Sequence, residues 1–157
     1  MSKVLSLADL PLAADDWRRG GAVVVLAAGA FDPFHVGHAQ HLKAAKRAGN
    51  VLVVSVAGDG QVRASKGAGR PRQPAAHRAE VVADLRYVDA VVVSESPNVV
   101  PVIQALRPQV FAKGREYAER VTDALIAETA AMLAHDGRVV YVSGEIVSSS
   151  TAILAGV

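Results

Sequence analysis

Short apolar runs alternate with amphipathic segments along most of the chain. Residues 22–28 (AVVVLAA) form a continuous apolar run bounded by glycines, a pattern that predicts a strand buried on both faces. Residues 37–49 carry apolar side chains at helical spacing and end in basic residues and a glycine, as helix C-termini often do. Residues 51–57 are again apolar. This order predicts a β-α-β unit with a right-handed crossover, and therefore a parallel sheet.

The same alternation continues towards the C-terminus and predicts further helices and strands. The helices are expected over residues 74–86, 97–106 and 121–135, and the strands over residues 90–93, 109–112 and 138–142. A last helix is expected to begin near Ser148, in a run of capping residues. Five parallel strands connected by helices predict an α/β protein with a Rossmann-like, three-layer α/β/α fold.

Two segments lack a clear period. Residues 58–73 are rich in glycine and arginine and predict a loop. Residues 1–20 predict a loosely attached lead-in. Neither a repeat nor a shift in composition divides the chain, so we expect one domain over residues 1–157.

Composition narrows the class of protein. A chain of 157 residues can bury one hydrophobic core, and a composition of 51% apolar but only 4% aromatic residues favours parallel strands covered by small-residue helices. The absence of cysteine excludes disulfides, thiolate metal sites and a cysteine nucleophile. The longest apolar stretch, residues 22–31, is well short of the ~20 residues that span a membrane. Without a signal-like N-terminus, we expect a cytoplasmic protein that has no membrane partner.

Charge is unevenly distributed along the chain. The formal net charge of +2 is too small to indicate nucleic-acid binding. Five cations nevertheless gather in sixteen residues, namely Arg63, Lys66, Arg70, Arg72 and Arg78. This basic segment is either a phosphate-facing loop or a solvated surface loop.

The segment GAFDPFHVGH, residues 29–38, carries the strongest chemical signal. It lies between the first predicted strand and helix, where open α/β sheets bind ligands. Two imidazoles, His35 and His38, flank a helix N-terminus whose N–H groups favour an anion, and Gly37 leaves room for a phosphate. The segment contains neither GxGxxG nor GxxxxGK[ST], so the two commonest phosphate-binding loops are disfavoured.

The motif HVGH and its surroundings resemble the HxGH nucleotidyltransferases, and most of all the adenylyltransferase domain of ADP-heptose synthases. The similar segments are KVLSLADL, GAFDPFHVGHAQHLKAAKRAG, VAGDGQV, KGAGRPRQPAAHRAEVVADLRYVD, LRPQVFAKGREY and SSSTAI. The resemblance implies transfer of a nucleoside monophosphate, preferably AMP from ATP, to a sugar 1-phosphate such as D-glycero-D-manno-heptose 1-phosphate. Pyrophosphate is the expected second product. Mg²⁺ is expected because a triphosphate is normally bound as its metal complex, and the resemblance implies a homodimer.

The resemblance assigns roles to three groups of residues. The expected catalytic residues are His35, His38 and Lys66. The expected nucleotide contacts are Gly29, Ala30, Phe31, Asp32, Gly37, Lys113, Gly114, Ser149, Ser150 and Thr151. The expected contacts to the phosphorylated substrate are Asp59, Arg63, Arg78 and Tyr117. No residue is expected to form a protein metal site, and we expect His41 to support the site or lie on the surface.

Some positions depart from the heptose pattern and leave alternatives open. Ala28 stands where an asparagine is common, and Arg115-Glu116 replaces a more usual Gly-Asp pair. The arginine that cytidylyltransferases carry before their Ser-Thr-Thr stretch is missing from residues 144–146. A cytidylyltransferase acting on glycerol 3-phosphate or another small phosphorylated alcohol remains an alternative. A non-catalytic nucleotide-binding protein is another.

Overall fold

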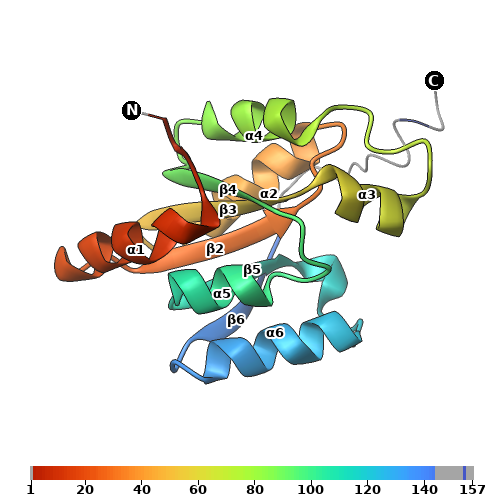
Figure 1. Ribbon diagram of the computed structural model, residues 1–157. Helices are drawn as coiled ribbons and strands as arrows, with labels where there is room; N and C mark the ends of the chain where they lie inside the picture. Colours follow the sequence, from red (N-terminus) through yellow and green to blue (C-terminus); the bar gives the residue numbers. More distant parts are fainter. Residues whose placement is uncertain (1, 144–153, 155–157) are drawn as a thin grey trace.

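Six parallel strands form the central layer of the part of the chain that the computed structural model describes, residues 2–143 and Leu154 (Figure 1). Their order across the sheet is β1-β4-β3-β2-β5-β6. The strands are β1 Val4–Leu5, β2 Val24–Gly29, β3 Val51–Ala57, β4 Ala90–Ser94, β5 Val110–Gly114 and β6 Arg138–Val142. The order reverses between β2 and β5, which are neighbours although two strands separate them in sequence.

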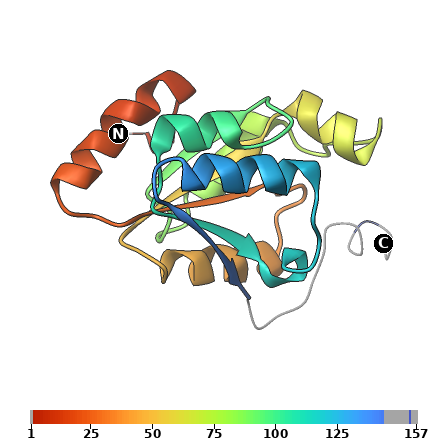
Figure 2. The ribbon, with the colours of Figure 1, turned by 90° about the horizontal axis from the view of Figure 1, so that it is seen from below.

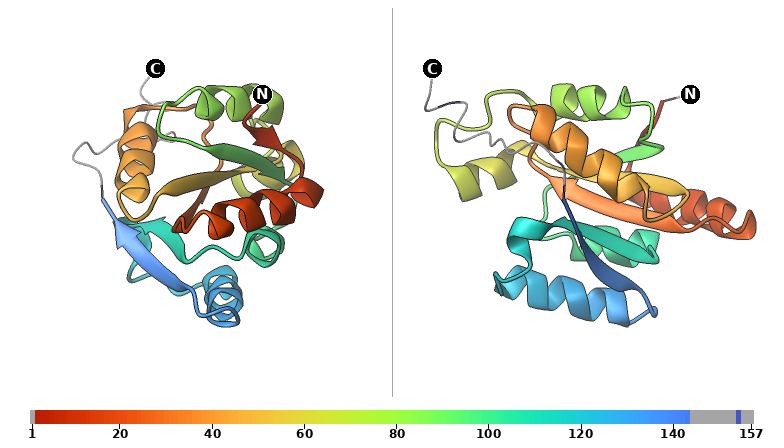
Figure 3. Two further views of the ribbon diagram at one scale, coloured as in Figure 1. Left: turned by 90° about the vertical axis from the view of Figure 1, so that its left-hand side faces the viewer. Right: turned by 180° about the vertical axis from the view of Figure 1, so that it is seen from behind.

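Helices cover both faces of this sheet. They are α1 Leu10–Arg19, α2 Val36–Lys46, α3 Asp59–Lys66, α4 Ala75–Ala83, α5 Val100–Leu106 and α6 Asp123–Leu133, with 3₁₀ turns η1 Leu7–Asp9 and η2 Arg115–Tyr117. The helices α2 and α4 lie on one face, and α1, α5 and α6 lie on the other (Figures 2 and 3). The three-layer α/β/α prediction is confirmed. None of these helices is long and apolar enough to cross a membrane.

The apolar runs form strands because both of their faces are buried. In β2, Val25 and Ala27 pack with Leu42 of α2 on one face of the sheet. Val24 and Leu26 point to the other face and join the core beneath α1, α5 and α6. A strand in the middle of a doubly covered sheet needs apolar side chains at every position, which explains the continuous run in the sequence.

The N-terminal segment differs from the prediction. Residues 4 and 5 add a sixth strand, β1, which pairs with β4, so the predicted count of five strands was wrong. Leu10 and Ala14 of α1 have no exposed surface, so the lead-in packs against the sheet instead of hanging loosely. A strand of two residues is too short to show an alternating pattern in the sequence. It forms because its backbone pairs with β4.

The glycine-rich segment also differs from the prediction, because residues 59–66 form the helix α3 and not a loop. One apolar side chain, Val62, anchors this helix with 1% of its surface exposed. Asp59 lies in the first turn and Arg63 and Lys66 in the last, which suits the helix dipole. Gly67 follows with φ of 104°, a conformation that favours glycine. Residues 67–73 contain no helix or strand, as predicted.

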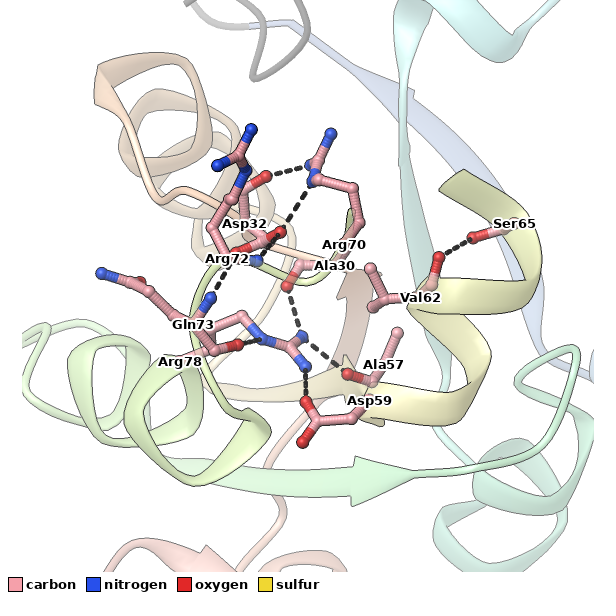
Figure 4. A network of polar contacts seen from close by, with 10 residues as sticks. All are labelled: Ala30, Asp32, Ala57, Asp59, Val62, Ser65, Arg70, Arg72, Gln73 and Arg78. Atoms are coloured by element: carbon pink, nitrogen blue, oxygen red, sulfur yellow. Dashed lines mark hydrogen bonds and ion pairs between the residues drawn. The ribbon is translucent and has the colours of Figure 1, made fainter. Parts of the chain in front are cut away.

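A buried arginine joins the loops around α3 (Figure 4). The side chain of Arg78, on α4, has no exposed surface. Its Nη1 donates to the carbonyl oxygens of Ala30 and Ala57 at 2.7 and 2.6 Å. Its Nε donates to the carbonyl oxygen of Gln73 at 2.9 Å, and its Nη2 pairs with Asp59 at 2.8 Å. One guanidinium therefore connects the ends of β2 and β3 to the start of α3 and to the segment before α4.

We expect Arg78→Met to lower the free energy of unfolding by about 2–4 kcal/mol, because three carbonyl oxygens and the Asp59 carboxylate lose the charged donor that connects them. Arg63→Met, on the exposed side of α3, is the matched control and should change the value by less than about 0.5 kcal/mol. Urea unfolding of both variants measures the difference. An Arg78→Met protein as stable as the control would contradict this role.

Candidate active site

A cavity of about 840 Å³ opens at the carboxyl ends of the strands, where the strand order reverses between β2 and β5. The structure brings most of the predicted site residues together in its wall, namely Gly29, Ala30, Phe31, Asp32, His35, Gly37, His38, Lys66, Lys113, Gly114 and Tyr117. Asp59, Arg63 and Arg78 are not in this wall. Ser149, Ser150 and Thr151 lie outside the described residues.

The two histidines cap the N-terminus of α2 and each other. His35 is the N-cap residue, and its Nδ1 accepts a hydrogen bond from the N–H of Gly37 at 3.0 Å. The Nδ1 of His38 accepts from the N–H of His35 at 3.2 Å. The two rings stack with their centroids 3.7 Å apart. Because both Nδ1 atoms are acceptors, each neutral ring carries its proton on Nε2.

The surroundings keep these rings neutral. Burial lowers the pKa of His38 to about 3, helped by the positive potential of His35, His41 and Lys66. Burial also lowers the pKa of His35 below its ordinary value. At neutral pH each ring therefore offers an Nε2–H donor, fixed in direction, beside the N–H groups of a helix start. This arrangement suits an anion whose charge increases during a reaction.

The ring of Phe31 packs against the ring of His38. Phe31 has φ of 54°, a rare conformation for a bulky residue, and is 2% exposed. Its ring meets the ring of His38 edge-on at a centroid distance of 5.1 Å. A β-carbon added at Gly29 would lie 2.9 Å from the Phe31 ring, so glycine leaves the space that this ring occupies. Backbone strain of this kind is commonly found at functional sites.

The carboxylate of Asp32 binds the segment from Arg70 to Gln73, which precedes α4 (Figure 4). This carboxylate, in a residue 1% exposed, accepts from Nε of Arg70 at 2.8 Å and from the N–H groups of Arg72 and Gln73. Arg70 also donates to the carbonyl oxygen of Asp32. Burial alone would raise the pKa of Asp32, but these hydrogen bonds and the charge of Arg70 lower it below its ordinary value. Asp32 thus shapes the rim of the cavity.

The wall of the cavity also contains a charged pair. The Nζ of Lys113, at the end of β5, lies 3.5 Å from Oε1 of Glu128 on α6. It also lies 5.0 Å from the ring centroid of Phe111 and 5.6 Å from that of Tyr117. Glu128 was missed by sequence reasoning. Its only signal in the sequence is a carboxylate in the middle of a mostly apolar helix, DALIAETAAML, on the same face as Met132.

His41 also lines the cavity, one helical turn beyond His38. Burial lowers its pKa, an effect that Glu116 opposes and Lys113 reinforces. The structure thus places His41 among the residues that line the cavity, and not behind them. The described residues contain no group of three histidine, aspartate, glutamate or cysteine side chains that could hold a metal ion.

Comparison with known proteins identifies the family of the chain. A family model described as cytidylyltransferase-like matches residues 26–153, which include both histidines and every residue that lines the cavity. The chain belongs to the cytidylyltransferase-like family. The family resemblance inferred from the HVGH motif is therefore confirmed.

Curated relatives align with most of this chain. The bifunctional protein HldE of Streptomyces coelicolor is 42% identical over 135 residues, which are 84% of this chain and 28% of the relative. HldE of Gluconobacter oxydans is 37% identical over 143 residues, which are 90% of this chain and 29% of the relative. The chain thus spans less than a third of the length of these relatives.

Solved structures share the fold. A lipopolysaccharide core biosynthesis protein from Thermoplasma volcanium superposes with a TM-score of 0.67 at 26% identity, covering 80% of this chain and all of that one. The pantoate-beta-alanine ligase of Francisella tularensis gives a TM-score of 0.63 at 12% identity, covering 90% of this chain and 66% of that one. The second likeness concerns the fold alone.

The lowered pKa of His38 predicts a pH-dependent stability. The unfolded chain binds this proton near the ordinary pKa of 6.5, whereas the folded chain binds it only near 3. The free energy of unfolding should therefore fall as the pH drops below 6.5, and the contribution of His38 between pH 7 and pH 5 should be about 1–2 kcal/mol. Urea unfolding at both pH values should show a smaller loss in His38→Gln. An identical loss in both proteins would contradict the assignment.

Proposed function

We propose that this family member is an adenylyltransferase that transfers AMP from ATP to a sugar 1-phosphate and releases pyrophosphate. The observation that carries the proposal is the pair of stacked, neutral imidazoles at the start of α2, which direct their Nε2–H donors from a helix N-terminus that forms part of the cavity wall. Phosphoryl-type transfer needs fixed donors around the reacting phosphorus more than it needs a protein nucleophile.

The reaction follows from this donor arrangement. A phosphate oxygen of the acceptor attacks the α-phosphorus, and the bond from that phosphorus to the oxygen shared with the β-phosphate breaks. The electron pair leaves with pyrophosphate. His35 and His38 stabilise the negative charge that grows on the phosphate oxygens, and Lys66, at the end of α3, neutralises the triphosphate. No covalent intermediate on the protein is required.

The choice of ATP and of a heptose 1-phosphate rests on similarity to relatives. The two relatives described above are bifunctional HldE proteins, and the segments around Lys66 and Lys113 resemble the adenylyltransferase domain of ADP-heptose synthases. The family description, cytidylyltransferase-like, supports CTP as the competing nucleotide. D-glycero-D-manno-heptose 1-phosphate is the proposed acceptor, and glycerol 3-phosphate is the competing one.

Mg²⁺ fits this site as a companion of the triphosphate and not as a resident of the protein. The described side chains form no cluster for a metal, and the buried carboxylate of Asp32 is already engaged by Arg70, Arg72 and Gln73. When bound, Mg²⁺ would neutralise phosphate charge, as it does when held mainly by phosphates and water. The protein then contributes the donors of His35, His38 and Lys66 to the remaining oxygens.

A matrix of the four nucleoside triphosphates against D-glycero-D-manno-heptose 1-phosphate, glycerol 3-phosphate and other sugar phosphates tests the proposal. Pyrophosphate release is the readout, and each nucleotide without acceptor is the control for hydrolysis. We expect the highest kcat/KM with ATP and the heptose phosphate, since the site residues resemble that branch. Equal or better turnover with CTP would contradict the nucleotide choice. ATP binding without pyrophosphate release from any pair would favour a non-catalytic nucleotide-binding protein.

A further inference from the structure

Glu128 is a buried carboxylate in the wall of the cavity. It lies in the middle of α6 and is 5% exposed. One oxygen, Oε2, accepts a hydrogen bond from the N–H of Val99 at 3.0 Å. The other, Oε1, lies 3.5 Å from Nζ of Lys113. A single side chain of α6 therefore contacts both the start of α5 and the end of β5.

Stability alone does not account for this pair. Removing a carboxylate and an ammonium from water is unfavourable, and apolar residues of similar volume often replace such pairs without loss of stability. The next inward position on α6 is the fully buried Met132, so the helix docks on the sheet through apolar contacts. The charged pair lies at the edge of the cavity and not in that core. A role toward the ligand explains the placement better.

Lys113 gains a fixed position from its neighbours. A lysine side chain has four flexible bonds and loses considerable rotamer entropy when a ligand orders it. Here the ammonium is held by Glu128 on one side and lies near the rings of Phe111 and Tyr117. These contacts restrict the ammonium before a substrate arrives, which reduces the entropy lost on binding.

The second oxygen of Glu128 fixes the turn before α5. Val99 is the N-cap residue of α5, and its N–H has Glu128 as its acceptor. The preceding residues Ser96, Pro97 and Asn98 line the same cavity as Lys113. The carboxylate therefore sets the distance between two parts of one wall.

We propose that Glu128 is a positioning residue, which holds the Lys113 ammonium and the turn before α5 in the geometry that binds substrate. This inference rests on the proposed function, because it assumes that Lys113 contacts one of the two substrates. Glu128 itself acts through Lys113 and Val99.

The test compares Glu128→Gln, Lys113→Met and the double variant. Glutamine keeps an oxygen that can accept from Val99 but removes the charge that holds Lys113. Lys113→Met identifies the substrate that the lysine contacts, as the one whose KM rises. We expect Glu128→Gln to raise the KM of that same substrate roughly tenfold, with kcat changed less than about threefold. In the double variant the KM should rise no further than in Lys113→Met, because the two residues act as one unit.

Glu119→Gln, an exposed glutamate outside the cavity wall, is the matched control and should match the wild type in every measurement. Wild-type KM in Glu128→Gln would overturn the proposal, as would additive effects in the double variant or a lower melting temperature with unchanged kinetics. If the wild type releases no pyrophosphate, the proposed function fails. Calorimetric binding of ATP and of the sugar phosphate by the same variants then still tests the positioning role, through the same non-additivity in Kd.

Discussion

The reciprocal cap between His35 and His38 is the interaction on which the rest of the site depends. Each Nδ1 accepts a backbone N–H of the first helical turn, so neither ring can rotate or take a proton there without losing the cap. Burial then lowers the pKa of both rings and keeps them neutral, and nearby positive charge adds to this effect at His38. What remains is a pair of Nε2–H donors with a fixed direction at a helix N-terminus, which is the kind of preorganised donor that stabilises charge on a reacting phosphate.

Two ion pairs, Asp32–Arg70 and Asp59–Arg78, hold the segments around the histidine pair in place. Asp32 holds the segment from Arg70 to Gln73 against the loop that precedes α2. Arg78 holds the ends of β2 and β3 to the start of α3, the helix that carries Lys66. Both ion pairs connect segments far apart in sequence, and both fix the rim of the cavity without extending into it as free charges.

Local patterns in the sequence predict much of this structure. They do not predict the interactions between residues that are distant in sequence. The apolar runs of β2 and β3 predict buried strands because burial on both faces leaves a continuous signal, and the HVGH segment predicts the histidine pair. The helix α3 is not predicted, because a single buried apolar residue, Val62, gives no helical period. Arg78 is expected to contact substrate, yet its side chain is buried, since side-chain direction depends on carbonyl groups from other elements. The role of Glu128 is not predicted, because its partners lie at the start of α5 and in β5.

The most direct test of this account is the steady-state kinetics of His38→Asn. The asparagine Oδ1 can take the place of Nδ1 as acceptor for the N–H of His35, so the cap and the melting temperature should be retained, while the Nε2–H donor is lost. If that donor stabilises charge only in the transition state, kcat should fall roughly 10²- to 10³-fold with KM little changed. A folded His38→Asn protein with near-normal kcat would contradict the central role of the histidine pair.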